Sequence, residues 1–246
     1  MEKSIHDLAL IEEGVTLGEG CRVAAYAVLK SGVTLGKDCL IDHHVIIGGE
    51  PQDLKFDPST PSGVVIGPNT VLREGVTVHR ATQSGMNTTI GADCLLMGNC
   101  HVGHDSVLGD NVILANGVLV AGHITVGDHA FISGNVVLHQ HIRVGEGCII
   151  SGGSRIGLDV PPYVIADGKN TVAGLNLIGL KRRGHSAEEI SDLKDCYRAV
   201  YMTKRTGSLQ EKAAHAQAKT EMGQKFLQFF SQEKRGFIYS GKYPVK

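Results

Sequence analysis

The sequence predicts an all-β solenoid built from hexapeptide repeats, followed by an α-helical domain. Aliphatic residues recur at every sixth position in three runs, over residues 11–47, 66–78 and 90–156. This period fits neither the 3.6 residues of a helical turn nor the plain alternation of a strand. Three hexads make one triangular coil, so residues three hexads apart should share a column, about 4.8 Å from each other along the axis.

Small residues stand where stacked coils would be crowded. Glycine directly follows the repeat aliphatic in many hexads, where we expect tight corners: Gly18, Gly36, Gly67, Gly91, Gly109, Gly127, Gly145 and Gly157. Five of the six cysteines fall four residues after a repeat aliphatic, and none belongs to a CxxC pair. We therefore expect the cysteines to be reduced thiols that fill the interior.

The period breaks twice, and both breaks are expected to form external loops. Ile47 and Ile66 are 19 residues apart where 18 would keep the phase. Between Val78 and Ile90 the phase is kept, but Ser84 stands in the aliphatic slot. Because insertions into a solenoid leave the coil on one face, we place loops at 48–65 and 79–89.

We assign residues 1–165 to the solenoid and residues 166–246 to a helical domain. Pro161 and Pro162 are expected to end strand pairing, because proline cannot donate to a ladder. Serine and glutamate three residues apart, at 186/189 and 208/211, predict helices over 187–205 and 209–220. A third helix is expected over 222–234, with its phenylalanines in the core.

Bulk composition excludes several classes of partner. The formal net charge is −1 with a pI near 6.9, which gives no global attraction to nucleic acid or to a membrane surface. No stretch of 18 apolar residues and no signal-like N-terminus is present, so we expect a cytoplasmic protein without stable membrane insertion. A lone prism would leave wide faces exposed, so a homo-oligomer is expected.

Polar residues share columns in three consecutive coils, which predicts a functional edge. His104, Gly122 and Gln140 form one column, and Asp105, His123 and His141 form the next. His139 belongs to the adjoining column, and His101 lies in the same corner region. Independent surface residues have no reason to share columns, so we interpret this set as a site.

The residue types in these columns suit proton transfer. A histidine can act as a general base near neutral pH, and a neighbouring carboxylate such as Asp105 can fix its tautomer. A glycine in the next coil, here Gly122, lets a reacting group approach a bare backbone N–H, as an oxyanion site needs. Two further polar groups are candidates for substrate contacts: Asp53 and Lys55 in the first loop, and the basic run Lys181, Arg182, Arg183.

With these residues the chain resembles a known family, the acyl-carrier-protein-dependent UDP-N-acetylglucosamine O-acyltransferases (LpxA), which open lipid A synthesis. The similar segments run through nearly the whole chain: IGGEPQDLKF (47–56), VTVHRAT (76–82), NCHVGHDSVLGDNVILAN (99–116), VAGHITV (120–126), VLHQH (137–141), DVPPYVIADG (159–168) and GLKRRG (179–184). The chain departs from the family pattern at Ala81, His141 and Ile178.

The resemblance implies a left-handed parallel β-helix and a homotrimer with active sites between subunits. It implies that His104 is the catalytic base, Asp105 its partner and Gly122 the oxyanion-hole amide. By the same matching, the sugar and pantetheine sites would involve Asp53, Lys55, His79, Arg80, His101, His123, His139 and Gln140. Asn176, Arg182 and Arg183 would contact the nucleotide end, and Gly152 would line the acyl groove.

The implied reaction transfers a 3-hydroxyacyl group from acyl carrier protein to the 3-position of UDP-N-acetylglucosamine, without a metal or a cofactor. An acceptor with a 3-amino group stays open as an alternative, whereas the QDLK and GLKRRG motifs argue against the related N-acyltransferase of the following intermediates. A zinc hydratase is a further alternative, because carbonic anhydrases of one class use this solenoid with three histidine ligands. The stacked polar edge argues against a non-catalytic hexapeptide scaffold.

Overall fold

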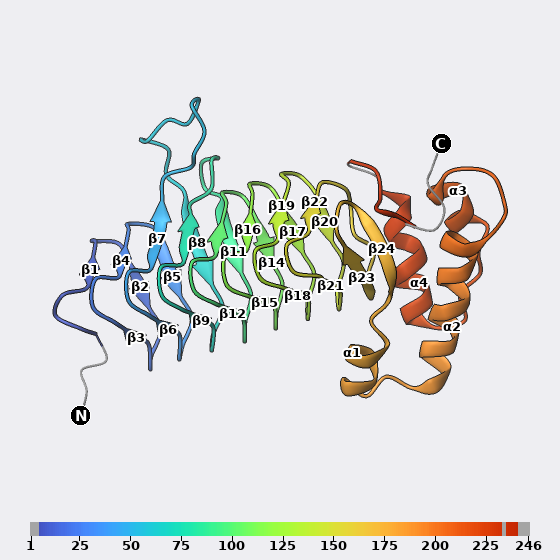
Figure 1. Ribbon diagram of the computed structural model, residues 1–246. Helices are drawn as coiled ribbons and strands as arrows, with labels where there is room; N and C mark the ends of the chain where they lie inside the picture. Colours follow the sequence, from blue (N-terminus) through green and yellow to red (C-terminus); the bar gives the residue numbers. More distant parts are fainter. Residues whose placement is uncertain (1–4, 233–234, 241–246) are drawn as a thin grey trace.

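The computed structural model, which describes residues 5–232 and 235–240, is an elongated prism with helices at its C-terminal end (Figure 1). Each hexad contributes a short strand followed by a corner, and three hexads complete one coil. The prism has three faces, and each face is a sheet whose neighbouring strands come from successive coils. The repeat therefore forms the predicted solenoid.

The three sheets run along the whole prism. The first face comprises β1 (Leu10–Ile11), β4 (Val28–Leu29), β7 (Ile46–Gly49), β10 (Thr77–His79), β13 (His101–Val102), β16 (Leu119–Val120), β19 (Val137–Leu138) and β22 (Arg155–Ile156). The second comprises β2 (Thr16–Leu17), β5 (Val33–Leu35), β8 (Gly63–Ile66), β11 (Asn87–Ile90), β14 (Val107–Leu108), β17 (Thr125–Val126) and β20 (Arg143–Val144). The third comprises β3 (Arg22–Val23), β6 (Leu40–Ile41), β9 (Val71–Leu72), β12 (Leu95–Leu96), β15 (Ile113–Leu114), β18 (Phe131–Ile132), β21 (Ile149–Ile150), β23 (Val164–Asp167), β24 (Thr171–Leu175) and β25 (Tyr239–Ser240).

The strand register confirms the predicted columns. His101 pairs in parallel with Leu119, and Val120 pairs with Leu138. Across the second loop, Val78 pairs with Val102, so the longer coil there returns to the same phase. The repeat aliphatics point inward and form a continuous buried core, and all six cysteines are buried and free, as expected.

The corners explain which residues the repeat selects. The third residue after the repeat aliphatic has a positive φ, for example 59° at Asp105, 60° at His123 and 66° at His141. Glycine, asparagine, aspartate and histidine tolerate this left-handed conformation best. Most glycines that directly follow the aliphatic have no positive φ; Gly48, where the first loop leaves the coil, is an exception at 86°. A Cβ on Gly18 would lie 2.5 Å from the carbonyl carbon of Gly36 in the next coil, so close stacking requires a glycine there.

Both predicted loops leave the prism, although each is shorter than expected. Residues 50–62 connect β7 to β8 and project from the prism, while residues 80–86 connect β10 to β11 beside them (Figure 1). The strands on either side extend into the predicted loop ranges of 48–65 and 79–89. The longer loop lies on the edge between the first and second faces, where β7 ends.

The prediction that Pro161 and Pro162 end strand pairing was wrong. After the two prolines, β23 pairs in parallel with β21, and β24 then returns antiparallel to β23. The prolines precede β23 and lie outside the ladder, so the sheet needs no N–H from them. The boundary placed after residue 165 falls inside β23.

The C-terminal helices begin where their caps predict, but they are shorter. Capping boxes at Ser186 and Ser208 open α2 (Ala187–Tyr197) and α3 (Leu209–Ala214). A π-helical turn, η1 (Arg198–Met202), follows α2, and η2 (Phe229–Ser231) follows α4 (Glu221–Gln228). The sequence reading missed α1 (Leu177–Arg182), which has only six residues. Residues 233–234 of the third predicted helix lie outside the described residues. Within the described ranges, no helix is long and apolar enough to cross a membrane.

One buried ion pair fastens the last coils to the helical domain. Asp159 is fully buried, and its carboxylate accepts the Arg143 Nε–H at 2.8 Å and lies 2.7 Å from Nη2. The same guanidinium donates to the carbonyl of Phe229 at 3.2 Å and stacks over its ring at 4.2 Å. Arg143 thus joins β20 to the segment that follows α4.

Replacing Arg143 by methionine should destabilise the protein strongly. The carboxylate of Asp159 would remain buried without its cation, which costs about 3–5 kcal/mol in comparable pairs. Lys225→Met is the control, because Lys225 is half exposed and its contacts to Glu146 and Glu221 are long. Denaturant unfolding at fixed protein concentration would measure both, and equal losses would contradict the prediction.

Candidate active site

The edge between the first and second faces carries the predicted polar columns. Its corners follow the strands β13, β16 and β19, which lie side by side in three successive coils. Each corner contributes neighbouring residues to the edge: His104 and Asp105, then Gly122 and His123, then His139, Gln140 and His141. The first two pairs are partly buried or buried, whereas the last three residues are exposed.

His104 and Asp105 form a hydrogen-bonded dyad. Nδ1 of His104 lies 2.7 Å from Oδ2 of Asp105, and the side chains are only 16% and 13% exposed. Burial works to raise the pKa of Asp105, but hydrogen bonds from His104 and Thr82, with His123 nearby, hold this pKa below its usual value. Asp105 is therefore an anion at neutral pH and accepts a hydrogen bond from the Nδ1–H of His104. In a neutral imidazole with this tautomer, the lone pair lies on Nε2.

Two threonines hold Asp105, and the sequence reading missed both. Thr82 donates its N–H to Oδ1 at 3.0 Å and its hydroxyl to Oδ2 at 2.8 Å, and Thr88 Oγ1 accepts the N–H of Asp105 at 2.9 Å. The 18-residue rule fails here because the loop lengthens the coil. The sequence did carry a signal for Thr82: Val78 and Val102 keep the six-residue phase, and counting three residues from each places Ala81, next to Thr82, opposite Asp105.

Gly122 makes room for the imidazole of His104. A Cβ at position 122 would lie 2.7 Å from Cε1 and 2.8 Å from Nε2 of His104, so the ring lies directly against this glycine. At the equivalent corner positions of the next edge, the backbone N–H groups of Ala92 and Asp110 donate to aspartate side chains of the following coil. No such acceptor for the Gly122 N–H is found within the described part of the chain. The glycine therefore presents an amide beside Nε2.

The other histidines extend this cluster in both directions. The ring of His123 meets that of His104 edge to face at 5.0 Å and stacks on His141 at 4.6 Å. On the other side, His79 packs edge-on against His101 at 4.6 Å, and His101 Nδ1 is hydrogen bonded to Thr77 Oγ1 at 2.8 Å. Burial lowers the pKa of His79 and lowers that of His101 to about 4. Both rings are therefore neutral at pH 7.

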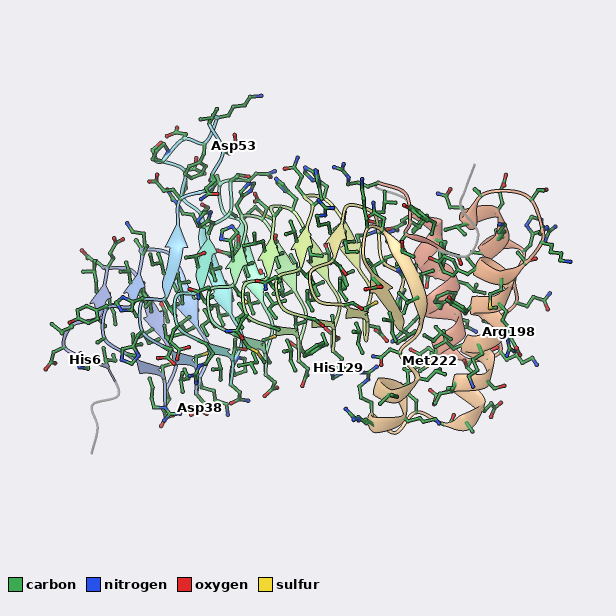
Figure 2. The ribbon with its side chains drawn as sticks, in the orientation of Figure 1. His6, Asp38, Asp53, His129, Arg198 and Met222 are labelled. Atoms are coloured by element: carbon green, nitrogen blue, oxygen red, sulfur yellow. The ribbon has the colours of Figure 1, made fainter. Side chains whose placement is uncertain are left out.

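Several predicted site residues do not reach this cluster. Asp53 lies on the projecting loop, away from the prism body (Figure 2), and its carboxylate accepts the N–H of Lys55. Arg80 donates to the carbonyls of Pro58 and Thr60, so its guanidinium braces that loop. The hydrogen bonds described for these three residues are thus made within the loop and not with the histidine cluster of the same chain.

The predicted nucleotide contacts belong to another edge. The Asn176 side chain caps α1 by accepting from Gly179 N–H and donates to the carbonyl of Gly147, so it has a structural role here. Arg183 lines a cavity of about 310 Å³ together with His129, on the edge between the second and third faces. Arg182 lies beside it at the end of α1.

Gly152 lies at the third edge, in the corner after β21. It has no positive φ, and a Cβ there would meet only the Gly134 carbonyl at 3.4 Å and Ser133 at 3.9 Å. The fold itself therefore does not require a glycine at this position. Within a single chain, neither Gly152 nor Arg182 lies beside His104.

The donor set fits a hydrogen-bonded dyad better than a zinc site. Ligand atoms of His104, Asp105 and His123 all lie within 4.8 Å of one another. Zinc ligands at about 2.0–2.1 Å from the metal lie about 3.3 Å apart in a tetrahedron. The His104 and Asp105 atoms are closer, at 2.7 Å, and Thr82 already donates to both carboxylate oxygens.

Stability should fall as the pH drops from about 6.5 to about 4, in part because of His101. Its folded pKa of about 4 is below the value of about 6.5 in an unfolded chain, so the unfolded state takes up the proton first. Below about pH 4 this contribution no longer changes. Thermal unfolding of His101→Gln should show a shallower loss over this range. His129→Gln, at an exposed position, is the control, and an unchanged slope in His101→Gln would refute the assignment.

Comparison with known proteins identifies relatives over the whole fold. Residues 159–238 match the family described as UDP N-acetylglucosamine O-acyltransferase, domain 2, and residues 87–122 match the bacterial transferase hexapeptide repeats. The acyl-[acyl-carrier-protein]–UDP-N-acetylglucosamine O-acyltransferase of Chlorobaculum parvum is 54% identical over 220 residues, which cover 81% of this chain and 83% of the relative.

The similar solved structures are of the same kind of enzyme as the sequence relative. LpxA, a UDP-N-acetylglucosamine acyltransferase from Bacteroides fragilis, superposes with a TM-score of 0.85 at 34% identity and covers 95% of this chain and 99% of its own. The UDP-N-acetylglucosamine acyltransferase from Campylobacter jejuni gives 0.83 at 32% identity, covering 96% and 99%. These neighbours and the hexapeptide match confirm the left-handed parallel β-helix with a C-terminal helical domain. Identity at this level over most of both chains establishes that the chain belongs to the UDP-N-acetylglucosamine O-acyltransferase family.

Proposed function

We propose that this chain is an acyltransferase that moves a 3-hydroxyacyl group from acyl carrier protein to the 3-hydroxyl of UDP-N-acetylglucosamine, the first step of lipid A synthesis. Family membership supports the reaction, and one observation carries the mechanism. The Nε2 side of the His104 ring lies against Gly122, so the base and the backbone of this glycine are neighbours. No group held from outside the chain is needed for this chemistry, and we propose no metal or cofactor.

His104 would act first as base and then as acid. Nε2 takes the proton of the sugar hydroxyl, whose oxygen attacks the thioester carbon. As the tetrahedral intermediate collapses, the carbon–sulfur bond breaks and the thiolate of the carrier takes the proton from Nε2. The Asp105 carboxylate stabilises the imidazolium that exists between the two transfers.

The backbone N–H of Gly122 would stabilise the intermediate. The thioester oxygen becomes an oxyanion when the hydroxyl attacks, and an amide beside Nε2 can donate to it. A side chain at position 122 would displace the imidazole, because its Cβ would come within 2.8 Å of Nε2. The glycine therefore serves both the base and the amide.

We propose that the working enzyme is a homotrimer whose sites lie between subunits. The base and Gly152 lie on different edges of one prism, Arg182 lies at the end of α1, and the loop with Asp53 projects outward (Figure 2). A neighbouring copy would bring a second edge to His104 and complete the site with contacts to sugar, pantetheine and nucleotide. We also propose a cytoplasmic enzyme, where its six buried thiols remain reduced.

Replacing His104 by alanine should reduce turnover by about 10²–10⁴-fold, because the general base is lost. The assay combines the purified protein, UDP-N-acetylglucosamine and 3-hydroxyacyl carrier protein, and mass spectrometry identifies a monoacylated UDP-sugar. His215→Ala, at the exposed histidine that caps the C-terminus of α3, is the matched control. A His104→Ala rate above about a tenth of wild type would remove His104 from this role, and product only from a 3-amino acceptor would favour the amide-forming alternative.

Replacing Gly152 by methionine should shift the donor preference toward shorter acyl chains. If this glycine lines the acyl groove, each excluded methylene costs about 0.8 kcal/mol, or about fourfold in kcat/KM. The open surroundings of Gly152 allow the methionine without backbone strain. Gly174→Met is the control, since a Cβ there meets nothing within 4 Å. A uniform loss across a ladder of acyl donors would exclude the groove assignment.

A further inference from the structure

We propose that Thr82 is a positioning residue that orients the Asp105 carboxylate toward His104. Within the described part of the chain, the hydrogen bonds that Thr82 donates go to Asp105 and not to the imidazole, so it would act through Asp105. The inference rests on the proposed role of His104 as the base. It adds a residue from the second external loop to the dyad.

Two histidines compete for one oxygen of Asp105. Oδ2 lies 2.7 Å from Nδ1 of His104 and 3.6 Å from Nε2 of His123. A small rotation of the carboxylate would move this oxygen from one imidazole toward the other. His104 keeps the tautomer with a free Nε2 only if the carboxylate accepts a hydrogen bond from His104 and not from His123. The rotation of the carboxylate must therefore be restricted.

Thr82 controls that rotation because it holds both oxygens. Its N–H donates to Oδ1 at 3.0 Å, and its hydroxyl donates to Oδ2 at 2.8 Å. Two donors from one residue define the plane of the carboxylate as well as its position. The second lone pair of Oδ2 then points to His104, where the hydrogen bond is short.

The backbone under the carboxylate is held as well. Asp105 has a φ of 59°, in the left-handed region, and its N–H donates to the hydroxyl of Thr88, which is fully buried. With the backbone anchored, side-chain rotation is the remaining freedom of Asp105. Thr82 removes this freedom.

The segment that carries Thr82 is itself braced. Arg80 donates to the carbonyls of Pro58 and Thr60, each at 2.8 Å, and the Ser62 hydroxyl donates to the carbonyl of Ala81 at 2.5 Å. Thr82 therefore reaches Asp105 from a loop that is tied to its larger neighbour. This bracing gives Arg80 a role in supporting the dyad.

The experiment compares three variants of the full-length protein. Thr82→Val removes the hydroxyl and keeps the shape and the N–H, whereas Thr82→Ser keeps both donors. Thr70→Val is the control, because the hydroxyl of this fully buried threonine likewise donates one hydrogen bond, to the carbonyl of Gly91 at 2.8 Å on another edge. Thermal unfolding verifies that all three proteins fold.

The kinetic readout separates positioning from binding. Thr82→Val should lower kcat about tenfold, the effect of losing one hydrogen bond to a charged group, with KM for both substrates within about twofold. Thr82→Ser should restore kcat to within about threefold of wild type, and Thr70→Val should leave it unchanged. Wild-type kcat in Thr82→Val, or equal losses in the serine and valine variants, would overturn the proposal.

A spectroscopic readout does not depend on the reaction. In protein with ¹⁵N-labelled histidine, the His104 signals are those lost in His104→Ala, and their shifts report which nitrogen carries the proton. Wild type and Thr82→Ser should show the Nδ1-protonated tautomer, and Thr82→Val should show a mixture. An unchanged tautomer in Thr82→Val would also overturn the proposal. Absence of acyl transfer by the wild type would refute only the proposed function, because the tautomer comparison still decides the role of Thr82.

Discussion

The parallel ladder between successive coils is the constraint on which the rest of the structure depends. Each strand hydrogen bonds to its equivalents in the coils above and below, so an 18-residue step in sequence becomes a step of one strand spacing in space. The ladder demands a repeating buried aliphatic, a corner residue with positive φ and a glycine where coils touch. It also places chosen side chains of three coils on one edge, and the site consists of these side chains.

A second aspartate–histidine pair shows that the dyad alone does not make the site. His43 Nδ1 lies 2.6 Å from Asp42 Oδ1, a contact as close as that of His104 and Asp105. His43 is 56% exposed, however, and Asp42 also lies 3.3 Å from the Arg73 guanidinium. His104 differs because it is mostly buried and lies against Gly122, with its carboxylate held by Thr82. Burial, the neighbouring amide and the threonine contacts distinguish the proposed catalytic pair from the more exposed pair of His43 and Asp42.

The two external loops differ in how they contact the candidate site. The short loop supplies Thr82 to Asp105, while the long loop carries Asp53 away from the body and depends on Arg80 for its conformation. One segment, residues 80–82, therefore contacts both the long loop and the dyad. The long loop leaves the same edge that carries His104, but Asp53 lies on its projecting part away from the prism body, which suits a site completed by a neighbouring copy.

The sequence by itself determined the solenoid, its columns and the central dyad, because a period of six places residues 18 apart in one column, and the neighbourhood of His104 and Gly122 follows from counting. The period did not determine the hand of the coil. It also located the caps at Ser186 and Ser208, which act locally. Only the tertiary structure decided what depends on contacts outside the repeat: Thr82 on Asp105, Arg80 on the loop, and the structural role of Asn176. The sheet continued past Pro161 and Pro162 for the same reason, since pairing of β23 depends on its distant partner β21 and not on the residues before it.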